Sequence, residues 1–154
     1  MNLAHLHLLL NHLPILGVPI ASLFLAHGIF KGNDSSRNFA YLILLLMAAT
    51  VIPTYLTGEP AEKVIEHIPD FSEDFIKPHE DAALVSLILT LLLGSIAIFR
   101  LIFVRNEFQE RKIAHIALSL TLVATTSLAY TGYQGGKVRH TELREESKVI
   151  TTHE

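Results

Sequence analysis

The sequence predicts an all-α integral membrane protein, a four-helix bundle with a short amphipathic helical cap between its second and third spans. Half of the 154 residues are hydrophobic and 18% are charged, whereas roughly 25% are charged in soluble domains. The apolar residues also lie in blocks without Asp, Glu, Lys or Arg, each near or above the ~18 residues typical of a spanning helix. These four blocks are Leu3 to Phe30, Asn38 to Gly58, Ala82 to Phe99 and Ile113 to Gly136.

Helix start and stop signals divide the chain into spans within one predicted domain, residues 1–154. Pro14 and Pro19 should bend the first span or restart it. Ser35 or Ser36 can cap the second, and Pro78 opens the third. The polar tail can extend the fourth span as a solvated helix. The predicted segments are residues 3–30, 39–57, 78–104 and 113–133, a cap at 58–77 and a tail at 134–154.

The cap belongs to the longest polar interval of the chain, residues 58–81, which holds eight acidic side chains. Pro60 suits the first turn of a short surface helix, because its missing N–H costs nothing there. Pro69 is expected to end this helix, and Ser72 to cap a second short turn.

Four spans place both termini and residues 58–81 on one side of the membrane, side A. The loops at 31–38 and 100–112 then lie on side B. Each side has six basic residues, so the charge around the first span decides the orientation. Lys31 and Arg37 follow that span and no Lys or Arg precedes it, which predicts a cytoplasmic side B. We expect a multi-pass membrane protein with side A on the outer side; the family resemblance given below implies the bacterial inner membrane, where that side is periplasmic.

Composition and missing motifs exclude several classes of function. The chain has no cysteine, which excludes disulfides, thiolate metal sites and c-type haem. A net charge of -3 gives no reason to expect nucleic-acid binding. No acidic or basic side chain lies mid-span, which disfavours a pump or an ion-coupled transporter. No P-loop, GxGxxG, HExxH or nucleophile elbow occurs, so whether the protein is an enzyme stays open.

Histidine is the unusual residue, with nine in the chain. The predicted topology brings four imidazoles to side A from four separate segments. Three glutamates of the cap lie at i, i+3 and i+7 and therefore share one helical face. Imidazole and carboxylate together suit Zn, Fe, Mn or Cu. The candidate ligands of a transition metal at side A are His12, Glu59, Glu62, Glu66, His67, His79 and His140.

Within this set we expect His12, His79 and His140 to hold the cofactor, with the cap residues as further ligands or as groups that orient the imidazoles. A haem b between the first and third spans would use His12 and His79 as its two ligands. Solvated acidic faces and interfacial histidines are the competing interpretation of the same residues.

The remaining histidines are weaker candidates. His27 and His115 form a second pair near side B, where interfacial histidines without a cofactor are the default interpretation. His5, His7 and His153 lie close to the chain termini, and we interpret them as surface residues.

Four short motifs resemble a family of small bacterial four-span membrane proteins of unknown function. They are HLPILG in the first span, TGEPAE after the second, the histidine that opens the third, and TGYQGGKVRH after the fourth. Relatives in this family are sometimes associated with cytochrome modules, and the resemblance therefore implies a membrane redox setting. It singles out His12, Glu59, Glu62, His79 and His140.

The leading hypothesis is an integral membrane protein with a His/Glu cofactor site, for a transition metal or haem b, at the outer face. Its role would be redox chemistry or that of a respiratory accessory. One alternative is a non-catalytic structural or interaction subunit of a membrane complex. Another is a membrane metalloenzyme, with a glutamate as general base beside a metal-bound water. The expected partners are the lipid bilayer and either a membrane redox partner or a second copy of the chain.

Overall fold

The computed structural model describes residues 2–67, 71–140 and 143–144, and this part of the chain is almost entirely helical. Its long helices are α1 (Leu3–Lys31), α2 (Asp34–Leu56), α4 (Ile76–Phe103) and α5 (Glu107–Arg139). Each is long and apolar enough to span a membrane. Between α2 and α4 lie the short helix α3 (Gly58–Ile65) and a 3-10 turn, η1 (Glu73–Phe75). The predicted all-α, four-span fold is confirmed.

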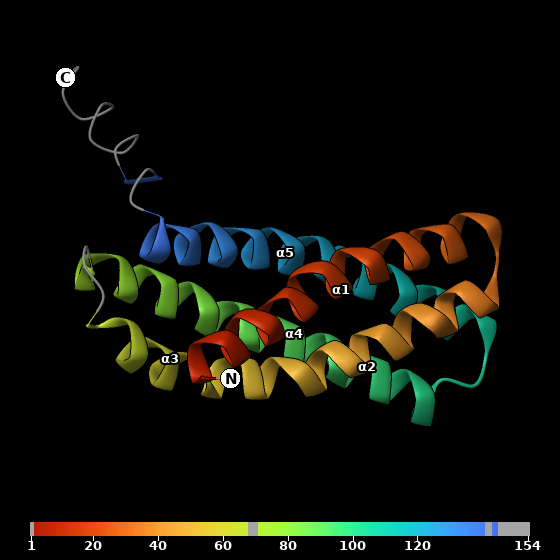
Figure 1. Cartoon of the computed structure of the whole chain (residues 1–154). Coiled ribbons are helices and arrows are strands. Elements are labelled where there is room, and N and C mark those ends of the chain that lie inside the picture. The colour runs from red at the N-terminus through yellow and green to blue at the C-terminus, as the bar shows by residue number, and fades with distance from the viewer. Residues whose placement is uncertain (1, 68–70, 141–142, 145–154) are drawn as a thin grey trace, which may run out of the picture.

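The long helices form a closed ring in which α1 packs on α2, α2 on α4, α4 on α5 and α5 on α1. Consecutive spans run in opposite directions, as Figure 1 shows. The start of α1, the helix α3 and the end of α5 lie at one end of the bundle, side A. The α1–α2 and α4–α5 connections lie at the other end, side B.

Asparagine caps lengthen the helices beyond the predicted spans at side B. Gly32 ends α1 with a φ of 62°, a left-handed conformation that glycine adopts without strain. Asn33 then caps α2 by accepting a hydrogen bond from Ser36 N at 2.9 Å, so the predicted caps Ser35 and Ser36 are wrong. Asn106 caps α5 in the same way through Gln109 N. The helix α1 continues through both of its prolines.

The cap is shorter than predicted. The helix α3 ends at Ile65, and Pro69, the predicted stop, lies outside the described residues. Ser72 occupies the N-cap position of η1, but its side chain makes no capping hydrogen bond. Pro60 lies in the first turn of α3, as expected.

Small residues let the helices approach closely on the inner side of the ring. A Cβ added at Gly94 of α4 would lie 2.4 Å from Cβ of Ala48 on α2. A Cβ at Gly28 of α1 would lie 2.5 Å from Cγ of Arg37. Leu25, Leu44 and Leu93 fill the core between these contacts and are fully buried. Helices in membranes commonly associate through such small residues.

Large apolar side chains cover the outside of the ring. Leu23 of α1 is 69% exposed and Leu101 of α4 is 63% exposed. A soluble helix would keep charged residues on such a face. Because these helices are long enough to span a membrane, the lipid bilayer is the environment that covers this surface.

Candidate functional site at the side-A end of the bundle

His79 lies in the first turn of α4 and is half-buried against α5. Its Nδ1 is 3.1 Å from the carbonyl oxygen of Thr131. The flat face of α5 at Gly135 makes room for the ring, since a Cβ there would lie 2.9 Å from His79 Cε1. The position of this imidazole therefore depends on a glycine in the neighbouring helix.

His7 of α1 is also half-buried, which corrects the prediction that it is a surface residue. Its Nδ1 lies 3.0 Å from the carbonyl oxygen of Thr54 and 3.1 Å from Thr57 Oγ1. Asn2 caps α1, so the helix is fully formed at His7. The ring then shares the inner face of α1 with Asn11, one turn further along. His7 lies close to the N-terminus but is not exposed, because the end of α2 covers this turn of α1.

His7 of α1 and His79 of α4, the side-A histidine pair, both lie at the side-A end of the bundle. In both rings Nδ1 faces a backbone carbonyl, which can only accept a hydrogen bond. Nδ1 must therefore carry the proton, and Nε2 is left as the unprotonated nitrogen of each neutral ring. A histidine that donates through one nitrogen to a carbonyl is oriented to bind a metal through the other.

Further polar groups line the bundle below the side-A histidine pair. Ser86 Oγ of α4 lies 2.8 Å from Ser127 Oγ and 2.9 Å from Thr131 Oγ1 of α5. Asn11 Oδ1 is buried and has no hydrogen-bond partner among the described residues. A buried acceptor of this kind is normally satisfied, so it marks a place where a donor from water or a ligand would be stabilised.

The three predicted cap glutamates differ in their surroundings. Glu59 is exposed and forms an ion pair with Lys63 at 2.7 Å. Glu66 is also exposed. Glu62 is half-buried, and its burial and then the nearby carboxylates, Glu80 first, raise its pKa above the ordinary value. The cap is therefore an acidic surface on which the charged form of Glu62 is disfavoured.

The other predicted ligands at side A are exposed. His12 lies on the outer face of α1, where its Nδ1 contacts the carbonyl oxygen of Leu8 at 2.5 Å. His67 follows α3, and His140 caps the end of α5. Across residues 2–67, 71–140 and 143–144, no three His, Cys, Asp or Glu side chains are arranged to hold a metal ion. The seven-residue metal site stays a prediction.

At side B, His27 contacts Ser36 Oγ at 2.9 Å and His115 contacts the carbonyl oxygen of Arg111 at 2.6 Å. Both histidines are exposed. His153 lies outside the described residues.

The sequence analysis missed a buried ion network at side B. Arg37 of α2 is 2% exposed and Glu110 of α5 is 6% exposed. Glu110 Oε1 lies 3.5 Å from Arg37 Nε, and its Oε2 lies 2.7 Å from Arg100 Nε. Arg37 also pairs with Asp34 and, at 3.3 Å, with Glu107. The signal was that the two loops, which the topology brings together, each contain both acidic and basic residues.

The comparisons with known proteins agree with this architecture. A family model described as a predicted membrane protein, DUF2231, matches residues 4–142, which cover all four long helices except for Leu3 at the start of α1. No curated protein and no solved structure shows significant similarity to the chain. The resemblance inferred from the four short motifs is confirmed at the level of the family. The chain belongs to the DUF2231 family of predicted membrane proteins of unknown function.

Proposed function

We propose that this protein holds haem b, or a transition metal, at the side-A histidine pair and has a redox or respiratory accessory role. The single observation that carries the proposal is the matched environment of His7 and His79. Each ring donates through Nδ1 to a carbonyl of a neighbouring helix, which directs ligand binding to Nε2. A bound haem would supply one-electron transfer.

The number of imidazoles favours haem b over a bare ion. Two histidines complete the axial coordination of haem iron, whereas Zn commonly takes three or four protein ligands. The histidines come from α1 and α4, the first and third spans that the haem hypothesis used, with His7 in place of His12. Asn11, with its unpartnered oxygen, lies one turn below His7 and adds a polar group to the same region.

The rival interpretations have less support. A subunit that packs on larger partners would use its small residues at the outer surface. Here Gly28 and Gly94 serve contacts within the bundle and Ser86 bonds to α5, although Ser95 and Ser119 are exposed. A metalloenzyme would place a glutamate beside a metal-bound water, but no hydrogen bond or ion pair among the described residues joins the half-buried Glu62 to His7 or His79.

The charge of side B supports a cytoplasmic location for that end. Its three carboxylates pair with arginines, as the ion network shows. The exposed cations without a carboxylate partner among the described residues are Lys31, Arg105 and Lys112. Basic residues next to spans favour the cytoplasmic side. We therefore infer an inner-membrane protein with the side-A histidine pair at the outer face.

A histidine scan tests the cofactor proposal. The protein and its variants His7→Ala, His79→Ala, His12→Ala and His140→Ala are purified in mild detergent. Visible spectra and elemental analysis are recorded, and circular dichroism controls for folding. We expect a Soret band that disappears in His7→Ala and His79→Ala and persists in the other two variants. Stoichiometric metal with the same mutational pattern, but without a Soret band, supports the transition-metal form of the site.

Loss of the cofactor in His12→Ala or His140→Ala, with binding intact in His7→Ala, would instead support the ligand set predicted from the sequence. If the folded protein carries neither haem nor metal after supplementation with both, the cofactor proposal is wrong. The interaction-subunit hypothesis would then be the better explanation.

A further inference from the structure

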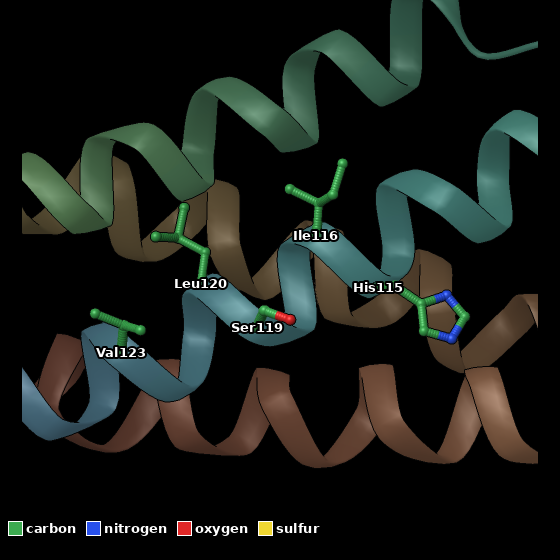
Figure 2. Close-up of a pocket in the computed structure, with 5 residues that line it drawn as sticks. All are labelled: His115, Ile116, Ser119, Leu120 and Val123. Carbon is green, nitrogen blue, oxygen red and sulfur yellow. The ribbon is translucent and has the colours of Figure 1, made fainter.

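A groove runs along the outer face of α5 near side B, and its volume is about 480 Å³. All of its lining side chains come from α5, and Figure 2 shows Ile116 and Leu120 directed toward α4. Ser119 is the smallest of these side chains. Ile116 is 56% exposed and Val123 is 57% exposed. The lining residues are His115, Ile116, Ser119, Leu120 and Val123.

The same helical face continues toward side B with a cation and an aromatic ring. Lys112 precedes the groove by one turn, and its Nζ lies 4.3 Å from the ring centroid of Phe108. Among the described residues, Lys112 has no carboxylate partner, because the nearby Glu107 and Glu110 pair with arginines. One strip of α5 therefore combines an uncompensated positive charge with an open apolar groove.

The length of this strip fits one leaflet of a bilayer. Eleven residues separate Lys112 from Val123, which corresponds to about 16 Å along a helix. The hydrocarbon core is ~30 Å thick, so the strip covers about half of it. Lysine and aromatic side chains are typical of the boundary between the core and the headgroups.

We propose that this strip binds an anionic phospholipid of the side-B leaflet. One acyl chain lies in the groove beside Ser119, and the phosphate contacts Lys112. His115 uses Nδ1 for the carbonyl oxygen of Arg111, which leaves its Nε2 available to the headgroup. A second copy of the chain fits less well, since a two-fold dimer through this face would bring the two Lys112 side chains together.

Native mass spectrometry of the delipidated protein in detergent tests the proposal. The probes are phosphatidylglycerol and phosphatidylcholine with identical acyl chains, together with glycerol phosphate as a headgroup without chains. We expect one phosphatidylglycerol per chain, retained about fivefold more strongly than phosphatidylcholine, as one basic side chain near a phosphate provides. Lys112→Gln removes this preference, and Ser119→Phe, which fills the groove, removes both lipids.

Two matched variants control for position. Lys31→Gln removes another exposed cation of side B, and Ser95→Phe adds the same ring to an exposed serine of α4. Both should retain phosphatidylglycerol as the unaltered protein does. The proposal is wrong if the two lipids bind equally, if Lys112→Gln matches Lys31→Gln, or if Ser119→Phe matches Ser95→Phe. Displacement of the lipid by glycerol phosphate, or a dimer that dissociates in Ser119→Phe, also overturns it.

Discussion

At the scale of single residues, the position of the His79 ring depends on Gly135 of α5, which has no side chain. Gly135 gives α5 a flat surface, and the ring lies against it while Nδ1 reaches the carbonyl oxygen of Thr131. Gly132, one turn away, faces Ile15 at an ordinary contact distance of 3.5 Å from an added Cβ. The two glycines therefore differ in what a methyl group would do.

Gly135→Ala should destabilise the protein by about 1–2 kcal/mol, because the strain of an overpacked contact exceeds the gain in helix propensity. Gly132→Ala, the control, should be neutral or slightly stabilising. Thermal unfolding in detergent measures both. If the cofactor proposal holds, Gly135→Ala also weakens the Soret band by displacing His79. Equal stability of the two variants would show that the ring does not depend on Gly135.

A second prediction at the scale of residues concerns the charge of Glu62 and its effect on stability. Burial and neighbouring carboxylates raise its pKa in the folded protein. The folded state then binds more protons than the unfolded state, and this group lowers stability as pH rises through its raised pKa. Glu62→Gln should therefore increase the melting temperature at pH 7, by about 1–2 °C because water screens much of the charge. The difference should vanish below the ordinary glutamate pKa of about 4.3.

Glu59→Gln is the control, and its effect on the melting temperature should have the opposite sign. A hydrogen bond from Lys63 lowers the pKa of Glu59, so its charge contributes stability above the ordinary pKa and loses that contribution as pH falls. We expect a small decrease in melting temperature at pH 7. A decrease in Glu62→Gln as well would contradict the assignment of Glu62 to a repulsive acidic surface.

At the scale of elements, the first turns of α5 tie two other helices together at side B. Glu110 contacts Arg37 of α2 and Arg100 of α4 through different oxygens. Arg100 also lies over the ring of Tyr41, 5.1 Å from its centroid. Since Arg37 and Glu110 are both buried, neither charge can be left without its partner at low cost.

Glu110→Gln should destabilise the protein by about 3 kcal/mol or more, because two arginines lose their shared carboxylate inside the bundle. The double variant Arg37→Met with Glu110→Met should lose less than the sum of its single substitutions. Chemical unfolding in detergent measures the free energy of unfolding of the two single variants and of the double variant. The exposed Lys63–Glu59 pair is the comparison, and its removal should cost much less stability than removal of the buried pair, because water screens it. Additive effects of Arg37→Met and Glu110→Met would show that the buried pair is not coupled.

The sequence predicts the spans well and the contacts at their ends poorly. Charge-free blocks identify the four spans, because a bilayer excludes charge over a fixed length. Such blocks say nothing about which charged residues lie under a neighbouring helix. The sequence analysis therefore assigned Arg37 and Glu110 to loops. In the structure both lie in helices, because α2 begins after its N-cap Asn33 and α5 begins after its N-cap Asn106.

For the same reason, the sequence did not show which histidines of side A are half-buried. His79 was correctly expected near the start of a span. His12 and His7 are five residues apart, and helical periodicity alone does not show which faces inward. The packing of α1 against the end of α2 decides in favour of His7.

At the scale of the whole molecule, the chain offers a direct test of orientation because it has no cysteine. Ser35→Cys places a thiol at side B and Asp74→Cys places one at side A, both at exposed positions. In intact bacterial cells with a permeabilised outer membrane, a membrane-impermeant maleimide should label Asp74→Cys only. Ser35→Cys should react after the inner membrane is opened. The reverse pattern would invert the orientation and place the histidine pair in the cytoplasm.

Arg37 pairs with partners both near to it and far from it along the chain, which has a consequence for biosynthesis. Asp34 and the carbonyl of Gly28 lie three and nine residues from Arg37 along the chain, whereas Glu107 follows 70 residues later. N-terminal segments leave the ribosome first. The α1–α2 hairpin therefore contains a carboxylate partner for Arg37, Asp34, before α5 has been made. Glu107 and Glu110 become available only when α5 follows.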